Sequence, residues 1–499
     1  MQRCKFRMWV ILGGMLAAWW AKPAGGADDW KRALSERPPN LVVIFVDDLG
    51  YGDIRPFGDP PYPTPHLDNL AERGRAFTDF LVPSAVCSAS RAALLTGCYP
   101  TRVGIEGALG PRSPIGISPQ EVTLGELCQS RGYATACIGK WHLGDHRDSL
   151  PLQHGFDFYF GLPYSNDMWS LHPDLMRLPP DVRARRQGYP DLPLLRGNEV
   201  FNPRVTADDQ RQLTTQYTEQ AVQFIQRHAD QPFLLYVAHS MVHVPLYVSD
   251  KFAGRSGSGL FGDCMMEIDW SVGEIVRILE ALELTDNTLI WFTSDNGPWL
   301  SYGDHAGNAG PLREGKGTSF EGGVRVPTLA CWPGRIPAGS YCAELATTMD
   351  ILPTTAALIG AALPEHTIDG HDIRNLLFGD EQAVSPHTSL AIYYAGGELQ
   401  AIRDRQYKLV FEHRYRTLAG NLGGTDGLPA AYQQVTMTPS LFDLHADPGE
   451  TTNIGEQHAD IVARLEAAAE RMRQELGDRL RGQEGKAVRP AARVTWEAN

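Results

Sequence analysis

The sequence has few of the features that mark nucleic-acid-binding, zinc-binding or membrane-spanning proteins. Acidic residues outnumber basic ones by 59 to 45, so bulk charge attraction to nucleic acid is excluded as the basis of its function. The cysteines form no C-x-x-C pair and no other zinc spacing. Sequons for N-glycosylation, internal repeats and low-complexity blocks are also absent. Because the net charge is negative, any anionic ligand must be held by local cations.

The N-terminal segment has the order of residues that is typical of a secretory signal peptide. Cations precede an apolar run over 8–21, and small residues follow over 24–27. The alternative is a membrane anchor, but the run is short for a span and no second one follows. We therefore predict a signal peptide over 1–27 and no stable membrane insertion. Export would lead to a periplasm or the exterior, or to a lysosome-like compartment in a eukaryote.

Removal of the predicted signal peptide would change both the charge and the redox setting of the chain. It takes away four cations and no acids, so the formal net charge goes from -14 to -18. An exported protein can form disulfides. The eight cysteines permit them, but the sequence leaves the pairing open.

Length and composition predict a large α/β domain followed by a smaller one. The chain has 499 residues, of which 43% are hydrophobic. A chain of this length is too long for a single small core. Short apolar runs alternate with helical patterns, as in a mixed, mostly parallel sheet flanked by helices. The clearest strands are Leu41–Val46, Ala134–Gly139, Phe233–Ala238 and Thr288–Ser294. The clearest helices are Pro65–Gly74, Gln210–His228 and Phe261–Leu282.

The pattern changes after about residue 385. Short alternating strands are followed by an amphipathic helix over Ile461–Leu476, which predicts an antiparallel sheet with a packed helix. We expect a large domain over 38–384, a smaller α+β domain over 385–478, and a flexible tail over 479–499, which is rich in Arg, Gly and Pro.

Each of the four predicted strands ends in polar residues that can do chemistry. The residues that follow them are Asp47 and Asp48, then Lys140 and His142, then His239 and His243, and finally Asp295 and Asn296. One such ending alone is usually a turn or a helix cap. Four of them indicate a shared site, because ligands bind beyond the carboxyl ends of strands in open α/β sheets.

The residue types at these ends suit a divalent cation and an oxyanion. The acidic and amide side chains offer hard oxygen atoms, which suit calcium or magnesium rather than zinc. Arg91, Lys140 and Lys316 could hold an oxyanion, although a loop lysine such as Lys316 can also be merely solvated. His142 and His243 are candidates for acid and base. His239 is the nearest rival to His243 for such a role.

A cysteine stands four residues before Arg91, in the segment CSASRAALLTG. Cys87 begins a predicted helix, whose N-terminus would lower the pKa of its thiol. A thiolate, however, is a poor ligand for a hard cation and a poor attacker of sulfate or phosphate esters. An ordinary cysteine nucleophile therefore fits the neighbouring residues badly.

The segment resembles the signature of type I sulfatases, C-x-P/A-x-R, whose cysteine is oxidised to formylglycine. Other segments resemble arylsulfatase A-type enzymes of the alkaline-phosphatase-like superfamily, in the same order, between Asn40 and Asn453. They are NLVVIFVDDLGYGD, GKWHLG, GFDFYFGLPYSND, PLREGKGTSFEGGVRVPTLACWPG and LFDLHADPGETTN. The resemblance implies a sulfatase that hydrolyses sulfate monoesters to an alcohol and inorganic sulfate, with its catalytic domain over 38–384.

The resemblance also implies a role for each site residue. One divalent cation, Ca²⁺ or alternatively Mg²⁺, would be bound by the oxygen of residue 87 and by Asp47, Asp48, Asp295 and Asn296. Cys87, as hydrated formylglycine (3-oxoalanine), would attack sulfur and form a covalent sulfate ester. Arg91 would steady this diol. The sulfate oxygens would be bound by Lys140, Ser165 and Lys316. His243, whose HxP context matches the family pattern, would protonate the leaving alcohol, whereas we expect His239 to pack or form hydrogen bonds nearby. His142 would take the proton of the second hydroxyl.

The motif departs from its commonest form at one position. Ala89 stands where proline is usual. The radical-type maturase of some bacteria accepts alanine at this position, whereas the oxygen-dependent formylglycine-generating enzyme prefers proline. A maturase partner is therefore implied, but the sequence leaves open which one. Aryl sulfate, sulfolipid and terminal sulfated sugar stay open as substrates, with 151–211 and 298–310 expected to shape the pocket.

Two other functions compete with sulfate ester hydrolysis. The first is a phosphatase or phosphonate monoester hydrolase of the same superfamily, which comparison of aryl sulfate and aryl phosphate would reveal. The second is a sulfated-glycan-binding protein without turnover, which would result if Cys87 stayed a thiol.

Overall fold

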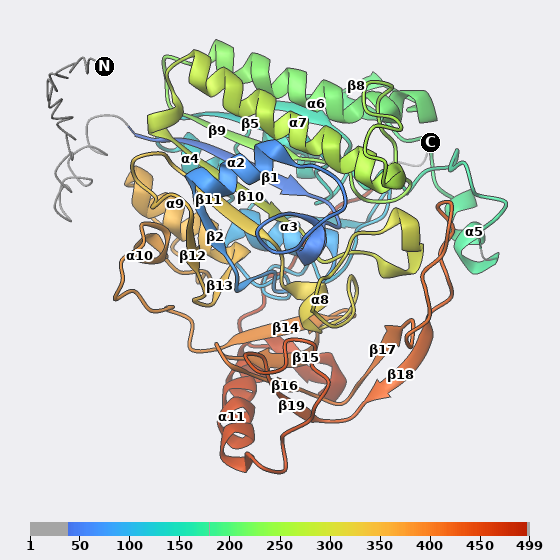
Figure 1. The fold of residues 1–499 in the computed structure, drawn as a ribbon, viewed down its shortest axis with the longest axis vertical. Helices are drawn as coiled ribbons and strands as arrows, with labels where there is room; N and C mark the ends of the chain where they lie inside the picture. Colours follow the sequence, from blue (N-terminus) through green and yellow to red (C-terminus); the bar gives the residue numbers. More distant parts are fainter. Residues whose placement is uncertain (1–37, 179, 497–499) are drawn as a thin grey trace, which may run out of the picture.

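The computed structural model describes residues 38–178 and 180–496 (Figure 1). The predicted signal peptide lies outside the described residues, so export stays a prediction. Among the helices that are described, none has both the length and the apolar character needed to cross a bilayer. All seven described cysteines are free thiols, so the disulfides that export would permit do not form among them.

A ten-stranded mixed sheet forms the centre of the N-terminal part. Its order is β12-β2-β11-β10-β1-β9-β5-β6-β7-β8. The strands in chain order are β1 (Asn40–Val46), β2 (Arg75–Phe77), β5 (Ala134–Gly139), β6 (Phe158–Gly161), β7 (Leu194–Arg196), β8 (Glu199–Asn202), β9 (Phe233–Ala238), β10 (Thr288–Ser294), β11 (Thr328–Cys331) and β12 (Ser340–Cys342). The five middle strands, from β10 to β6, run parallel. The predicted α/β class with a mostly parallel sheet is confirmed.

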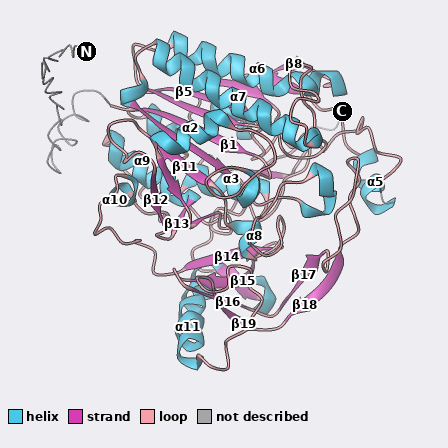
Figure 2. Ribbon diagram, viewed as in Figure 1, coloured by secondary structure: helices cyan, strands magenta, loops and turns pink. Residues whose placement is uncertain are grey.

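Helices cover both faces of this sheet (Figure 2). One face carries α2 (Pro65–Arg73), α6 (Ala207–Arg227) and α7 (Gly259–Ala281), and the other carries α3 (Cys87–Thr96), α4 (Leu124–Gln129) and α9 (Ile351–Ile359). The shorter helices are α5 (Pro180–Gln187), α8 (Glu321–Val324) and α10 (Arg374–Leu377), and two-residue strands occur at β3 (Phe80–Leu81), β4 (Ile115–Gly116) and β13 (Ala346–Thr347).

The strand β1 contributes side chains to two apolar cores, one on each face of the sheet. Its side chains alternate between faces, as in any strand, so Val42 and Ile44 join the apolar cluster beneath α6 and α7. Val43 and Phe45 join the cluster on the α3 side. A strand buried on both faces reads as one continuous apolar run, and this is why its position was predictable.

Local signals fix the ends of the helices that flank the sheet. At the start of α6, the Thr206 amide donates to Asp209 Oδ2 (2.7 Å) and the Asp209 amide donates to Thr206 Oγ1 (3.2 Å), which is a capping box. The helix α3 ends at Gly97, whose φ of 68° suits glycine as a C-terminal cap. The cap at Gly97 ends the short, wholly buried helix that carries Cys87 and Arg91.

The C-terminal part contains the predicted antiparallel sheet and packed helix. The sheet order is β14-β15-β16-β19, and α11 packs on it. Its elements are β14 (Leu390–Tyr394), β15 (Glu398–Arg403), β16 (Tyr407–Val410), β19 (Ser440–Asp443) and α11 (Ala459–Leu476). A separate hairpin of β17 (His413–Thr417) and β18 (Gln433–Met437) stands beside this sheet, and its connecting loop reaches toward the catalytic part near α5 (Figure 1).

The prediction of a flexible tail over 479–499 was wrong for 479–496. Three short strands lie at or near this segment, at Gly477–Asp478, Gln483–Glu484 and Ala492–Arg493, and the last pairs with β4. Arg489 donates two hydrogen bonds of 2.7 Å to Glu121, and Trp496 Nε1 donates to the carbonyl of Ser113 (2.9 Å). Composition alone misled here, because the arginine and the tryptophan find partners far away in the sequence.

Candidate active site

The predicted site residues meet beyond the carboxyl ends of β1, β5, β9 and β10. They come from the four strand ends, from the first turns of α3, from the loop after β6 and from the loop before α8. All are buried, with at most 6% of any residue exposed: Asp47, Asp48, Cys87, Arg91, Lys140, His142, Ser165, His243, Asp295, Asn296 and Lys316. Apart from His239, the residues that the sequence singled out for the site therefore lie together at this edge of the sheet.

Three carboxylates form the floor of the site and fit a divalent cation. Oxygen atoms of Asp47, Asp48 and Asp295 lie within 4.8 Å of one another. The Oδ1 atoms of Asp47 and Asn296 are buried without a hydrogen-bond partner, which is costly unless something else satisfies them. A cation that prefers oxygen ligands would satisfy both. The donor set therefore suits calcium or magnesium.

The charges on these carboxylates are unequal. Burial would raise the pKa of Asp47, but Lys140, His243 and Arg91 together hold it far below its usual value. For Asp295 the balance is reversed, because burial and the charge of Asp47 raise its pKa to about 7. A bound divalent cation would favour the ionised form of Asp295.

Three cations surround the carboxylates. The Arg91 guanidinium lies 2.8 Å from Asp295. The Nζ atom of Lys140 lies 2.5 Å from Asp47 Oδ2 and 3.2 Å from Ser165 Oγ, and Lys316 Nζ donates to both oxygens of Asp48 (2.6 and 2.9 Å). Three cations offset three carboxylates, so a bound divalent cation would leave an excess of positive charge. Such a site favours an oxyanion.

Two histidines present nitrogen atoms within this cluster. His243 Nδ1 lies 2.6 Å from the carbonyl of Val244, which leaves Nε2, 3.7 Å from Asp48 Oδ2, for other partners. His142 Nε2 lies 2.8 Å from the carbonyl of Leu109, while its Nδ1 is buried and unpaired. Burial lowers the pKa of both rings, and Lys316 adds to this at His243. Each can exchange a proton at the nitrogen that its carbonyl contact leaves free.

His239 lies apart from these groups. Its Nε2 is 3.3 Å from Ser271 Oγ of α7, as expected for a packing histidine.

Cys87 is the first residue of α3 and only 3% exposed. Its Sγ lies within 4.8 Å of ligand atoms of Asp47 and His243. Burial raises the pKa of the thiol despite the nearby Lys140 and Lys316. The unmodified side chain therefore stays a neutral thiol and makes a poor nucleophile.

Two of the site residues adopt an unusual backbone conformation. Asp48 has a φ of 60° and His142 a φ of 64°, in the left-handed region that non-glycine residues seldom occupy. Such strain concentrates at functional sites, where the surroundings hold it in place. Sequence patterns carry no signal for it here.

Sequence reasoning missed several neighbours of the site. Trp299 lies beside His243 (ring centres 5.6 Å apart) and beneath Lys316 Nζ (4.6 Å from its ring centre). The carboxylate of Asp167 pairs with Arg186 (2.9 Å) and interacts with the His243 charge. Trp299 falls within the segment expected to shape the pocket, and Asp167 lies two residues after Ser165, so local signals for both existed.

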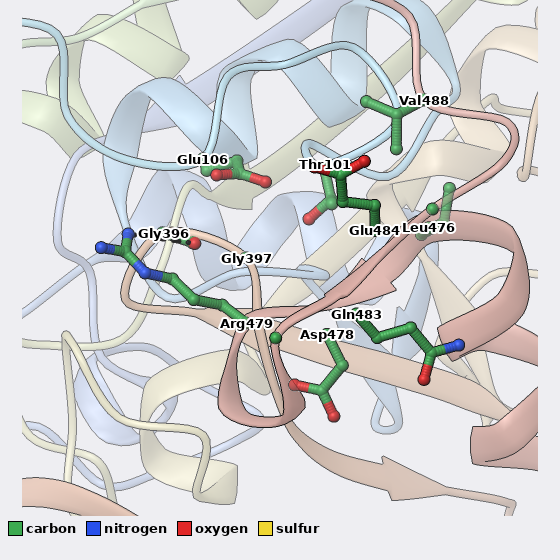
Figure 3. Close-up of a pocket in the computed structure, with 12 residues that line it drawn as sticks. Thr101, Glu106, Gly396, Gly397, Leu476, Asp478, Arg479, Gln483, Glu484 and Val488 are labelled. Atoms are coloured by element: carbon green, nitrogen blue, oxygen red, sulfur yellow. Dashed lines mark hydrogen bonds between the residues drawn. The ribbon is translucent and has the colours of Figure 1, made fainter.

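A large cavity elsewhere in the molecule has no part in this cluster. Its volume is about 520 Å³, and it lies between the loop after α3 and the C-terminal part (Figure 3). Its lining includes Glu106, Asp478 and Arg479, and none of the site residues above. The convergence of charged side chains, rather than cavity size, therefore locates the site.

Comparison with known proteins agrees with the fold. Residues 39–361 match the sulfatase family, and 385–493 match the C-terminal region of aryl-sulfatase. Arylsulfatase A of Bos taurus is 42% identical over 433 residues, 84% of this chain and 83% of the relative. N-acetylgalactosamine-6-sulfatase of Canis lupus familiaris is 35% identical over 484 residues, 89% of each. The crystal structure of the sulfatase PsFucS1 from Pseudoalteromonas sp. superposes with a TM-score of 0.78, at 30% identity, over 89% of this chain and 93% of that one.

These matches, together with the mostly parallel sheet, define a hydrolase of sulfate esters. The chain belongs to the sulfatase family and is an arylsulfatase A-like type I sulfatase. Its reaction is the hydrolysis of sulfate monoesters. The competing phosphatase and binding-protein functions are not favoured.

Proposed function

We propose that the chain cleaves sulfate monoesters with a formylglycine made from Cys87 and with one divalent cation, Ca²⁺ in preference to Mg²⁺. The observation that carries this proposal is the position of Cys87, a buried thiol with a raised pKa beside three carboxylates and two unpaired oxygens. A hydrated aldehyde there supplies two hydroxyls on one carbon, one to attack sulfur and one to release sulfate. Asp47, Asp48, Asp295 and Asn296 would hold the cation.

The cations around residue 87 would bind and orient the substrate. Lys140 and Lys316 would bind sulfate oxygens, and Ser165, which already contacts Lys140, would donate a further hydrogen bond. Arg91 would hold the hydrated side chain of residue 87. Because these groups are buried and fixed by ion pairs, they stabilise charge without rearranging.

The two histidines would move the protons. His243 would protonate the alcohol oxygen as its bond to sulfur breaks, helped by the Asp48 carboxylate, which favours the charged ring. His142 would take the proton of the remaining hydroxyl at Nδ1, and the carbonyl forms as sulfate leaves. Rehydration of the aldehyde consumes one water, so the balance is ester plus water to alcohol plus hydrogen sulfate.

The substrate would be a sulfate monoester of a small molecule or a carbohydrate. The aromatic face of Trp299, beside His243, stands near the position of the leaving alcohol. Aromatic side chains pack well against ring compounds, so an aryl sulfate is the natural first assay substrate.

The modification of Cys87 would require a maturase that acts before the chain folds. Cys87 is 3% exposed, and every residue of α3 is buried, so an enzyme could not reach the thiol in the folded protein. Ala89 points to a radical-type maturase. We also propose that the chain is exported and that its signal peptide is removed by cleavage after Ala27, which sequencing of the mature N-terminus would test.

The decisive experiment is the mass of the tryptic peptide Ala76–Arg91 from protein co-expressed with each type of maturase. A mass of the aldehyde or its hydrate at residue 87, together with hydrolysis of an aryl sulfate faster than of the matching phosphate, would support the proposal. The variant Cys87→Ala should fold and show no turnover, and Cys87→Ser should be nearly inactive or retain a sulfate ester. Turnover that persists in Cys87→Ala, or with an unmodified thiol, would overturn it.

A further inference from the structure

We infer that Arg416, on strand β17 of the C-terminal part, is a positioning residue for Lys316. The inference rests on the proposed role of Lys316 in binding sulfate. It assigns part of the sulfate-binding geometry to a strand that lies about one hundred residues further along the chain.

The backbone of Lys316 is held on both sides. Its amide donates to the carbonyl of Pro298 (2.9 Å), and its own carbonyl accepts a hydrogen bond of 2.6 Å from Arg416 Nη2. The amide of Gly317 donates to the carbonyl of Ala85 (2.9 Å), two residues before Cys87. Arg416 thus completes the fixation of a short segment that spans from the pocket loop to the start of α3.

Arg416 is itself oriented by two aromatic rings. Its guanidinium carbon lies 4.8 Å from the ring centre of Tyr432 and 5.6 Å from that of Trp299. The Trp299 ring in turn lies 4.6 Å from Lys316 Nζ. Such contacts favour a flat cation and are sensitive to replacement by lysine. Arg416 therefore acts on Lys316 through its backbone and through the shared indole ring.

Other residues of β17 contact the loop that carries Lys316. Thr417 Oγ1 donates to Glu314 Oε1 (2.6 Å), and Arg313 donates to the hydroxyl of Tyr415 (2.8 Å). His413 Nε2 lies 3.4 Å from Ser319 Oγ. Contacts on both sides of Lys316 come from one strand, so displacement of β17 would displace the lysine.

Gly317, the residue after Lys316, lies directly against the guanidinium of Arg416. Gly317 has a φ of +77°, and a Cβ there would lie 2.3 Å from Arg416 Nη2. The lysine side chain is long and flexible, so its backbone must be held for its ammonium to be placed reproducibly. Misplacement of a binding group by about 1 Å can cost about 100-fold in rate.

The test compares Arg416→Met with Arg414→Met, which removes an exposed arginine from the same strand. With matured enzyme and an aryl sulfate, we expect Arg416→Met to lower kcat/KM by about 10- to 100-fold and to weaken inhibition by inorganic sulfate, while Arg414→Met changes neither. Arg416→Lys, which keeps one donor, should recover part of the loss. Unchanged kcat/KM and sulfate inhibition in Arg416→Met would overturn the inference.

A double-mutant cycle separates positioning from general destabilisation. If Arg416 acts through Lys316, then Arg416→Met should have little further effect on kcat/KM in a Lys316→Met background. Equal losses in both backgrounds would show that Arg416 acts on folding or on another group. Thermal unfolding identifies any variant that fails to fold. If Arg416→Met fails to fold, the conservative variant Arg416→Lys is compared with the wild type in its place.

A readout without turnover keeps this inference separate from the proposed function. Hydrogen exchange of the peptide that contains Lys316 and Gly317 should be faster in Arg416→Met than in Arg414→Met, because the segment loses the hydrogen bond that Arg416 donates to the Lys316 carbonyl and opens more easily. If the wild-type enzyme shows no sulfate ester hydrolysis, the proposed function fails, but exchange still decides the positioning. Equal exchange in both variants would overturn it.

Discussion

Arg91 and Asp295 form a fully buried ion pair, with Nη2 2.8 Å from Oδ2. The pair joins the second turn of α3 to the end of β10. Arg91 also donates to the carbonyl of Lys140 (3.0 Å) and lies 3.4 Å from Asp47, so it links three strand ends and the helix that carries Cys87. Removing one member of such a pair leaves uncompensated buried charge.

Replacement of Arg91 by methionine should therefore destabilise the protein strongly. We expect Arg91→Met to lower the free energy of unfolding by about 3–5 kcal/mol and to abolish turnover, while Arg91→Lys keeps the charge and loses less. Urea denaturation measures the first effect and an aryl sulfate assay the second. The control is Arg55→Met, whose pair with Asp59 is exposed and worth less than about 1 kcal/mol. Equal effects of Arg91→Met and Arg55→Met on stability would contradict this prediction.

Removal of divalent cations should lower both stability and activity. Asp47 Oδ1 and Asn296 Oδ1, which have no hydrogen-bond partner in the protein, would lose the proposed cation, and ligand loss lowers the melting temperature by mass action. Differential scanning fluorimetry of chelated protein should show a rise in Tm on adding Ca²⁺, and a smaller rise with Mg²⁺. The variant Asp295→Asn should respond less. A Tm that neither cation changes would argue against the metal site.

Asp53 should make stability fall as pH rises. Its carboxyl is 3% exposed and accepts hydrogen bonds from the amides of Gly50 (2.7 Å) and Asn308 (2.9 Å). Burial raises its pKa from 3.8 to about 7, although these hydrogen bonds oppose the shift. Between those values the folded protein keeps a proton that the unfolded chain has lost, so this stabilising contribution is full below the unfolded pKa and is lost as pH rises through the folded pKa.

The variant Asp53→Asn isolates this contribution, because an amide does not titrate. Its free energy of unfolding relative to the wild type should rise with pH over this window, by at most about 1.4 kcal/mol per pH unit, and level off above about pH 7. Urea denaturation at several pH values measures the difference, in which the other titrating groups cancel. A difference that does not vary with pH would show that Asp53 is ionised in the folded protein.

The tail contact should contribute to stability and not to catalysis. Arg489 is the bidentate partner of Glu121, which is 1% exposed. We expect Arg489→Ala to cost about 1–3 kcal/mol of unfolding free energy with kcat/KM unchanged, and Arg493→Ala, at an exposed position on the same tail, to cost almost nothing. A tail that is loose in solution would make the two variants alike in urea denaturation.

The main strands were predictable where consecutive residues of the sequence are all apolar. The strands β5, β9 and β10 have the predicted bounds, and β1 begins one residue earlier, because strands buried on both faces are continuous apolar runs. The site residues were predictable because each follows such a strand or lies in a motif of the family. Their chemical roles stay predictions.

What the sequence did not reveal depends on contacts between distant residues. Arg416 carries no local mark, since its partners Lys316 and Trp299 lie on other loops. The tail was predicted to be flexible because it is rich in Arg, Gly and Pro, whereas Glu121 provides a buried partner for Arg489. The left-handed conformation of His142 depends on tertiary packing that overrides local preference.

One apolar cluster extends across the boundary near residue 385. It contains Leu94 of α3 and Leu352 of α9 together with Ile402 of β15, Leu441 of β19 and Leu465 of α11. Neither part can therefore cover its own apolar surface when the chain is cut between them. The two parts should melt in a single cooperative transition, and a proteolytic nick near this boundary should leave the fragments associated rather than release a smaller folded protein.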